Sequence, residues 1–291
     1  MIDIGMKIDD RYRVTSRIAH GGMADVYEAY DILMHRTVAL KIMRTDMINE
    51  VNIERFEKEG IVSASLDSPL IVKVYGQGEV DGRPYMVNEY VEGRTLRDKL
   101  NVSTGHNLTP LEAIDVMLQL TEGVSYIHEH GILHRDLKPD NLFYLSDGSI
   151  KIADFGIAMK IGESDESDGV AGTIYYCAPE TLVGQKPNVT SDIYSMGVIF
   201  FELLTGTVPF EGETTDDIAI AQIKKHFPEP SKIVPSLPKV LDKIVVKACR
   251  KSPDERYQSS KEMHDAIKKT LENEDKLKER KSLFSRIFGF K

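Results

Sequence analysis

The stretch His134-Arg135-Asp136-Leu137-Lys138-Pro139-Asp140-Asn141 decides the fold of this chain, and Asp154-Phe155-Gly156 begins 13 residues after its asparagine. The first stretch brings carboxylate, cationic and amide side chains together within one short segment. Two such motifs at this spacing make a chance match remote. A motif still needs its structural context, so the rest of the chain has to supply matching strands, helices and partner residues.

Composition limits the class of protein. The chain has 291 residues, 41% apolar and 29% charged, as expected for a soluble globular protein of one large domain or two lobes. A net charge of −9 argues against nucleic acid as a partner. Two cysteines, Cys177 and Cys249, give no disulfide framework and predict a reducing, cytoplasmic location. No signal peptide is expected, because residues 1–7 lack a long apolar run after a basic start, and no membrane span is expected, because no apolar run approaches ~20 residues.

Strand patterns dominate the first third of the chain. Alternating or β-branched residues predict five strands, at 12–18, 24–29, 37–43, 71–75 and 85–90. Charged residues with scattered apolar positions predict one helix over 49–66. This part therefore reads as a sheet with a single main helix.

Helical patterns dominate the remainder. Thr109-Pro110-Leu111-Glu112 is a capping box with proline at the first helical position, and Gly131 ends that helix. Further helices are predicted at 191–205, 214–226, 237–250 and 259–273. We expect an α+β protein with a strand-rich lobe (1–91), a helical lobe (92–272) and a basic and apolar tail (273–291). A small ligand is expected between the lobes.

The motifs together resemble the eukaryotic-type protein kinases over residues 10–270. The likeness is greatest to the kinase domains of bacterial serine/threonine kinases of the PASTA-domain group, and it is carried by 21–27, 192–198 and 204–210. The resemblance implies a bilobal protein-kinase fold, with a five-stranded antiparallel N-lobe and a mostly helical C-lobe. It implies transfer of the γ-phosphate of ATP to Ser/Thr hydroxyls of proteins, including the chain itself.

Residues between the first two strands are candidates for covering the phosphates of ATP. Ala19, His20, Gly21 and Gly22 resemble the kinase glycine-rich loop, although Ala19 and Ala24 replace its outer glycines. A plain hairpin with a Gly-Gly turn is the alternative interpretation.

A lysine at the third strand is the candidate cation for the α- and β-phosphates. Val38-Ala39-Leu40-Lys41 resembles the kinase motif V-A-I-K, which makes Lys41 that residue. Glu59 is the preferred carboxylate partner of Lys41, and Glu54 and Glu57 are its rivals on the same helix.

The resemblance also implies an adenine site. The backbone carbonyl of Glu89 and the amide of Val91 are expected to bind the base. Val26, Ala39 and Phe143 are expected to enclose its ring, although each would also suit a plain core position.

The catalytic loop supplies the candidate base and metal ligands. Asp136 is expected to accept the proton of the substrate hydroxyl, and Lys138 to stabilise the transferring phosphate. Asn141 and Asp154 carry the oxygen ligands that Mg²⁺ prefers, with Mn²⁺ as an alternative ion.

Substrate binding and regulation are assigned by resemblance. Lys138 and Thr173 are typical of serine/threonine specificity, and Glu180 of Ala178-Pro179-Glu180 is expected to pair with Arg256. Arg135 is the usual receptor for a phosphate on the activation segment. Ser164 and Ser167 are the candidate phosphorylation sites. A second form of the same hypothesis is that the four acidic residues of 162–169 partly substitute for phosphate charge. A plain solvated acidic loop is the alternative.

Two departures from the family pattern remain. Asn88 is polar where an apolar residue usually precedes the hinge. The tail from 276 has six basic residues and one acidic residue among aromatic ones. It suits weak contact with an acidic membrane at its inner face, a partner protein, or an unstructured end.

Three functions are compatible with these motifs: an active kinase of proteins, a pseudokinase scaffold that binds nucleotide, and a small-molecule kinase. Protein substrates are favoured because 178–180, Asp192 and Arg256 belong to the platform that binds them. An N-lobe homodimer, as relatives suggest, is a further expectation.

Overall fold

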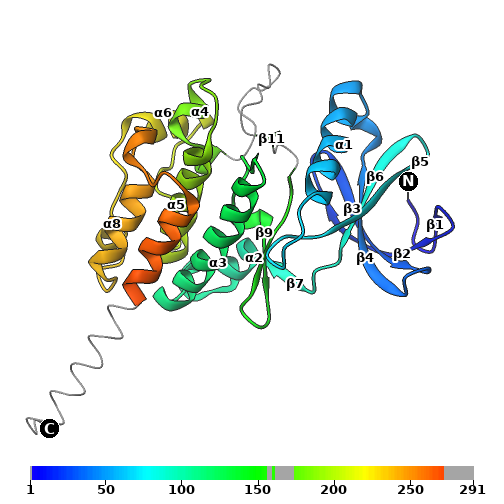
Figure 1. The fold of residues 1–291 in the computed structure, drawn as a ribbon, viewed down its shortest axis with the longest axis horizontal. Helices are drawn as coiled ribbons and strands as arrows, with labels where there is room; N and C mark the ends of the chain where they lie inside the picture. The colour runs from blue at the N-terminus through cyan, green and yellow to red at the C-terminus, as the bar shows by residue number, and fades with distance from the viewer. Residues whose placement is uncertain (1, 156–158, 161–173, 272–291) are drawn as a thin grey trace, which may run out of the picture.

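The computed structural model describes residues 2–155, 159–160 and 174–271 of the chain. A twisted antiparallel sheet with one helix forms one end of the molecule, and a bundle of helices forms the other (Figure 1). The sheet has the strand order β1-β2-β3-β4-β6-β5. Its strands are β1 (Lys7–Ile8), β2 (Tyr12–His20), β3 (Ala24–Asp31), β4 (Arg36–Met43), β5 (Val74–Val80) and β6 (Arg83–Glu89).

The sheet differs from the prediction in two places. It has six strands instead of five, because the two-residue strand β1 pairs with β2 but is too short to show an alternating pattern. The strand predicted at 71–75 begins only at Val74. Ile71 instead forms an isolated parallel bridge with Ile152, so it joins the sheet end to the helical end.

The two faces of the sheet have different roles. Tyr27, Leu40 and Val87 are buried in an apolar cluster on one face. Because side chains alternate along a strand, their neighbours Val26 and Lys41 lie on the other face. That second face is turned toward the helix α1 (Glu50–Ala64), which begins at the N-cap Asn49.

The helical end is built around two long helices. They are α3 (Pro110–Glu129), which begins with the predicted capping box at Thr109, and α5 (Val189–Thr205), which ends at the left-handed Gly206. A side chain at Gly206 would meet the Gly105 carbonyl oxygen at 2.1 Å. The other helices are α2 (Leu96–Val102), α4 (Pro179–Leu182), α6 (Thr215–Lys224), α7 (Pro230–Ile233), α8 (Lys239–Ala248) and a last one at 260–271.

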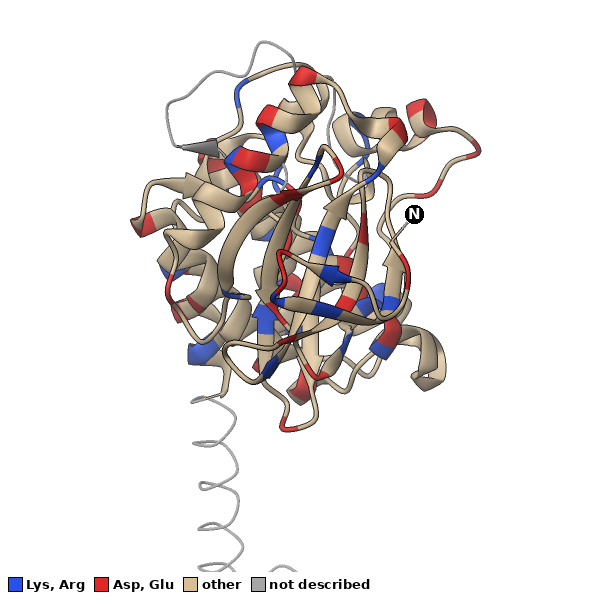
Figure 2. Cartoon of the chain, turned by 90° about the vertical axis from the view of Figure 1, so that its right-hand side faces the viewer, with Lys and Arg blue, Asp and Glu red and all other residues tan. Residues whose placement is uncertain are grey.

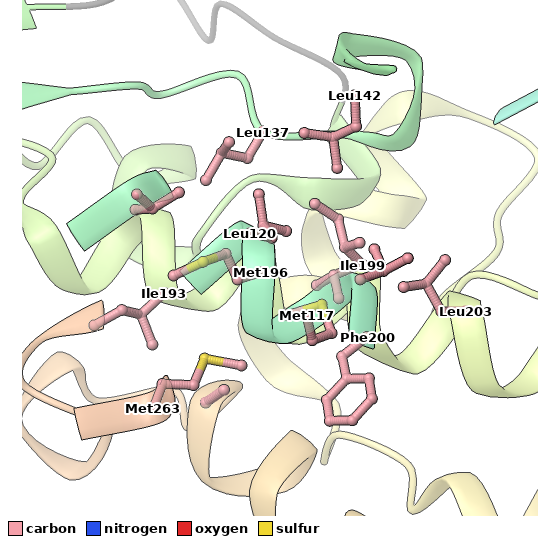
Figure 3. Packing of buried hydrophobic residues seen from close by; sticks show 14 of the residues in the cluster. Met117, Leu120, Leu137, Leu142, Ile193, Met196, Ile199, Phe200, Leu203 and Met263 are labelled. Carbon is pink, nitrogen blue, oxygen red and sulfur yellow. The ribbon is translucent and has the colours of Figure 1, made fainter. Parts of the chain in front are cut away.

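The core of this end supports the segment quoted first. Figure 3 shows Met117 of α3 and Met196 and Ile199 of α5 packed together, with Leu137 and Leu142 lying over them. Leu137 and Leu142 are 1% and 0% exposed. These two buried leucines anchor the polar residues 138–141 between them to the core. Short strands flank it: β7 (Gly93–Thr95), β8 (Ile132–Leu133), β9 (Leu142–Leu145), β10 (Ile150–Ile152) and β11 (Met159–Lys160).

Basic and acidic positions are mixed along the ribbon that Figure 2 colours by residue type. Lys and Arg positions are interspersed with Asp and Glu on the sheet and on the helices. Within the described residues, no helix combines the length and the hydropathy that crossing a bilayer requires.

Candidate active site

The segment 134–141 folds back on itself through its own polar side chains. Lys138 Nζ donates to Asp136 Oδ2 at 2.6 Å. Asn141 Nδ2 donates to the backbone oxygen of Asp136 at 2.9 Å and to its Oδ2 at 3.0 Å. The Asp136 carboxylate is only 15% exposed, so these two donors fix its position.

A carboxylate from α5 fixes the backbone of the same segment. Asp192 accepts the N–H groups of His134 and Arg135 at 2.9 Å each. His128 of α3 brings Nε2 to 2.8 Å from Asp192 Oδ2. Burial alone would raise the pKa of Asp192, but these partners outweigh it and lower the pKa. Arg135 has a φ of +69°, an unusual conformation for a residue with a side chain, and Asp192 holds it there.

Three ionisable residues far apart in the sequence meet at Lys41. Its Nζ lies 2.5 Å from Glu59 Oε1 and 2.9 Å from Asp154 Oδ1. The lysine comes from β4, the glutamate from α1 and the aspartate from the loop after β10. Of the rival glutamates, the exposed Glu54 and Glu57 make no ion pair with Lys41. The contact joins the sheet end to the helical end.

The two carboxylates at Lys41 have opposite pKa shifts. Burial raises the pKa of Glu59 to about 7, although Lys41 opposes the rise. The positive charge of Lys41 lowers the pKa of Asp154 to about 2. The Asp154 side chain is 43% exposed and the Glu59 side chain 5%. The ionised form of Asp154 therefore loses less hydration than that of Glu59. Burial would lower the pKa of Lys41, but the two carboxylates raise it.

The residues Asn141 and Asp154 fit a divalent cation. The N–H of Ala153 donates to the Asn141 carbonyl at 2.9 Å, which holds the two candidates close together. Asn141 bonds to Asp136 through Nδ2 and Asp154 bonds to Lys41 through Oδ1, so Asn141 Oδ1 and Asp154 Oδ2 are the oxygens that would face a cation. Asp154 has a φ of +64°, and the ring of the buried Phe155 packs on His134 with centroids 4.9 Å apart. Amide and carboxylate oxygens are the ligands that Mg²⁺ takes beside phosphate.

An arginine side chain binds the backbone of the turn between β2 and β3. Gly21 N–H donates to the Ala24 oxygen at 3.0 Å, and a Cβ at Gly21 would lie 2.8 Å from that oxygen, so glycine is required there. Arg44 Nη1 donates to the Gly21 carbonyl at 3.0 Å. His20 Nδ1 lies 2.6 Å from Asp25 Oδ1. Arg44, the residue after β4, lies in no recognisable motif and therefore could not be selected from the sequence.

The sheet face that carries Lys41 fits a planar base. Val26 is directly opposite Lys41 in the pairing of β3 with β4, and Ala39 is two residues from Lys41 on the same face. The N–H of the half-buried Val91 makes no hydrogen bond within the described part of the chain. The backbone N–H of Glu89 donates to the backbone oxygen of Lys73. The carboxylate of Glu89 forms an ion pair with Lys151 at 2.9 Å. Phe143 is half-buried on β9.

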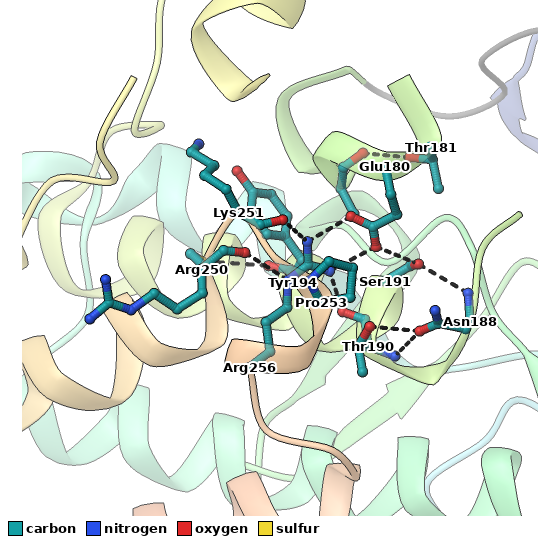
Figure 4. Close-up of polar contacts among 12 residues, drawn as sticks. Glu180, Thr181, Asn188, Thr190, Ser191, Tyr194, Arg250, Lys251, Pro253 and Arg256 are labelled. Atoms are coloured by element: carbon teal, nitrogen blue, oxygen red, sulfur yellow. Dashed lines mark hydrogen bonds and ion pairs between the residues drawn. The ribbon is translucent and has the colours of Figure 1, made fainter. Parts of the chain in front are cut away.

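A buried ion pair joins α4 to residue 256 in the helical end. Glu180 at the start of α4 lies against Arg256, with oxygen–nitrogen distances of 2.7 and 2.6 Å. Figure 4 shows the two groups facing each other, with Ser191 donating to Glu180 at 2.8 Å. The contact is the one expected from the sequence. The candidates Ser164, Ser167 and Thr173 lie outside the described residues.

Comparison with known proteins assigns this arrangement to a family. Residues 12–280 match the protein kinase domain. The chain belongs to the protein kinase family. This kinase-family chain is 39% identical over 281 residues to the serine/threonine-protein kinase PrkC of Bacillus subtilis, covering 96% of the chain and 43% of that protein. The resemblance seen in the sequence and the bilobal protein-kinase fold are thereby confirmed.

Other bacterial kinases show the same degree of similarity. The probable serine/threonine-protein kinase PknB of Lactococcus lactis is 38% identical, with 90% of this kinase-family chain and 42% of that protein covered. PknB of Mycobacterium tuberculosis is 37% identical, with 88% and 42% covered. The chain therefore spans about two fifths of the length of the curated relatives that it matches.

Proposed function

We propose that this chain is a protein serine/threonine kinase that uses ATP and Mg²⁺, or Mn²⁺ in its place. The observation that carries the proposal is the contact of Lys41 with both Glu59 and Asp154. The contact brings a lysine from the sheet beside a carboxylate from the helical end, which supports the proposed roles of Lys41 at the phosphates and of Asp154 at the metal. Names of the relatives support transfer to Ser and Thr hydroxyls.

The reaction proceeds through positioning and charge neutralisation. Lys41 binds the α- and β-phosphates, while Val26, Ala39 and Phe143 enclose the base. Asn141 and Asp154 hold Mg²⁺, which neutralises phosphate charge when bound. The oxygen of the substrate hydroxyl bonds to the γ-phosphorus, and Asp136 accepts the proton of that hydroxyl. The bond between the γ-phosphorus and the leaving oxygen of ADP breaks. Lys138 stabilises the transferring phosphoryl group.

The turn between β2 and β3 determines the backbone conformation of the residues proposed to cover the phosphates. Ala19, His20, Gly21 and Gly22 lie over the phosphates in this proposal. Arg44, bound to the Gly21 carbonyl, keeps the turn in one conformation. The alanines at 19 and 24 favour the same outcome, because alanine has less backbone freedom than glycine.

A labelling assay tests the function. Wild-type protein incubated with labelled ATP, Mg²⁺ and a general protein substrate is expected to label that substrate. Lys41→Met removes charge-assisted hydrogen bonds to phosphate and is expected to lower kcat/KM about 10- to 100-fold. Nucleotide binding without labelling would indicate a pseudokinase scaffold. Equal labelling by wild type and variant would refute the proposal.

The raised pKa of Glu59 predicts a pH effect. The ionised carboxylate holds the Lys41 ammonium, so kcat/KM for ATP is expected to rise with pH through about 7, the pKa of Glu59 in the free protein. Glu59→Gln should abolish this limb, whereas the titration of ATP itself remains in both proteins. An unchanged limb in the variant would assign it to another group.

The contribution of Glu59 to the stability of the fold decreases as pH rises, whereas its effect on kcat/KM increases. Its pKa is higher in the folded chain than the ordinary 4.5, so the folded state binds the proton more tightly. This group therefore stabilises the fold fully below pH 4.5, and that contribution is lost as pH rises through about 7.

Regulation is proposed to act through the activation segment. Arg135 would receive a phosphate on Ser164 or Ser167, placed there by the chain itself, and Thr173 would contact the catalytic loop. Phosphate mapping of active protein tests this, together with Ser164→Ala and Ser167→Ala. Unmodified serines and fully active variants would favour the acidic-loop alternative.

The partners and location remain proposals of the same kind. We infer protein substrates, an N-lobe homodimer, and a cytoplasmic location at the inner face of the membrane, with weak contact through the tail 276–291. Glu180, Asp192 and Arg256 support the protein-substrate platform. Liposome co-sedimentation that is unchanged by deletion of 276–291 would exclude the membrane contact.

A further inference from the structure

Asn88, next to last in β6, has a buried carboxamide oxygen. The side chain is half-buried, and its Oδ1 makes no hydrogen bond with any described residue. A buried amide oxygen without a donor is unfavourable, because it has lost its water and gained nothing. The donor that this oxygen needs can come from a bound water or from a ligand.

The strand register shows which way Asn88 faces. It lies directly opposite Ala39 of β4 on one side and Val74 of β5 on the other. Val87, its neighbour in β6, is buried in the apolar cluster on the far face. Asn88 therefore shares the sheet face of Ala39 and Lys41, against which the base of ATP is proposed to lie.

The direction of the chain then sets which edge of the base meets Asn88. The base is expected to bind through the Glu89 carbonyl and the Val91 N–H. Adenine offers its N6 amino group as a donor to that carbonyl and the adjacent N1 as an acceptor for that N–H. Since β6 runs into 89–91, N6 lies nearer β6 than N1 does. The purine edge beyond N6 carries N7, and Asn88 directly precedes Glu89. The N6/N7 edge is therefore the one turned toward Asn88.

We propose that Asn88 reads this edge, accepting the second N6 proton with Oδ1 and donating from Nδ2 to N7. A carboxamide presents an acceptor and a donor side by side, the complement of adenine N6 and N7. Guanine presents two acceptors there, O6 and N7, so Oδ1 would again lack a donor. Asn88 is thus a specificity residue for adenine over guanine, an inference that rests on the proposed ATP-dependent function.

Calorimetry with ATP and 7-deaza-ATP, in which C–H replaces N7, tests the pairing. In the presence of Mg²⁺, wild-type protein is expected to bind 7-deaza-ATP about 3- to 10-fold more weakly than ATP. Asn88→Leu should bind ATP about 10-fold more weakly than wild type and should no longer distinguish the two nucleotides. Asn101→Leu, at an exposed position of α2, is the matched control and should behave as wild type.

The outcomes separate this inference from the proposed function. Equal affinity of wild type for both nucleotides, or the same preference in Asn88→Leu, would overturn the role of Asn88. ATP binding and phosphate transfer in that same protein would leave the kinase function standing. Failure of wild type to bind ATP would overturn both. The wild-type comparison needs no variant, so the test does not depend on the folding of Asn88→Leu.

Discussion

Asp136→Asn is expected to lower kcat about 10²- to 10⁴-fold, because it removes the group that accepts the proton of the substrate hydroxyl. The substitution preserves the shape of the side chain. Asn141 can still donate to the backbone oxygen of residue 136, a bond of 2.9 Å in the wild-type chain. The KM for ATP should therefore change little, and steady-state kinetics with a protein substrate will show the split.

A control in the same lobe separates catalysis from general damage. Asp147→Asn makes the identical change at an exposed hairpin turn, where Asp147 Oδ1 accepts the Ser149 N–H at 2.9 Å. The amide oxygen of asparagine can accept that bond, so activity should stay within about twofold of wild type. Equal losses in both variants would remove Asp136 from its role as base.

Much of the fold was predictable because the pattern of apolar residues is strong. The strands β2, β3 and β4 alternate, and the capping box at Thr109 marks the start of α3. The failures have physical causes. The strand β1 is too short for a pattern, and the β-branched residues at 71–72 pack between the two ends of the molecule instead of pairing in the sheet.

The candidate site was predictable where a motif exists and not where contacts arise from the fold. Lys41 and Asp154 could be selected because each lies in a recognisable string. Glu59 could be chosen over its rivals only through its expected position, and its contact with Lys41 depends on how α1 packs on the sheet. His128 and Arg44 belong to no motif, so their contacts with Asp192 and Gly21 required the structure.

The largest expected effect on stability is that of Arg256→Met. The guanidinium is 0% exposed and donates to Glu180 and to the carbonyl oxygens of Arg250, Thr190 and Lys251. Its removal leaves the Glu180 carboxylate, 4% exposed, without its countercharge. The free energy of unfolding is expected to fall by about 3–5 kcal/mol, which urea denaturation will measure.

The cause of that loss can be isolated with a second substitution. If the loss comes from the uncompensated charge, Glu180→Gln combined with Arg256→Met should destabilise less than the sum of the single changes. The pair lowers the pKa of Glu180 against the effect of burial, so its stabilising contribution is present above pH 4.5 and is lost as pH falls through the lowered pKa. Lys261→Met breaks an ion pair whose lysine is 72% exposed and should cost less than about 1 kcal/mol. Additive single changes, or an effect of Arg256→Met no larger than this control, would show that the buried charge is not what holds α4 in place.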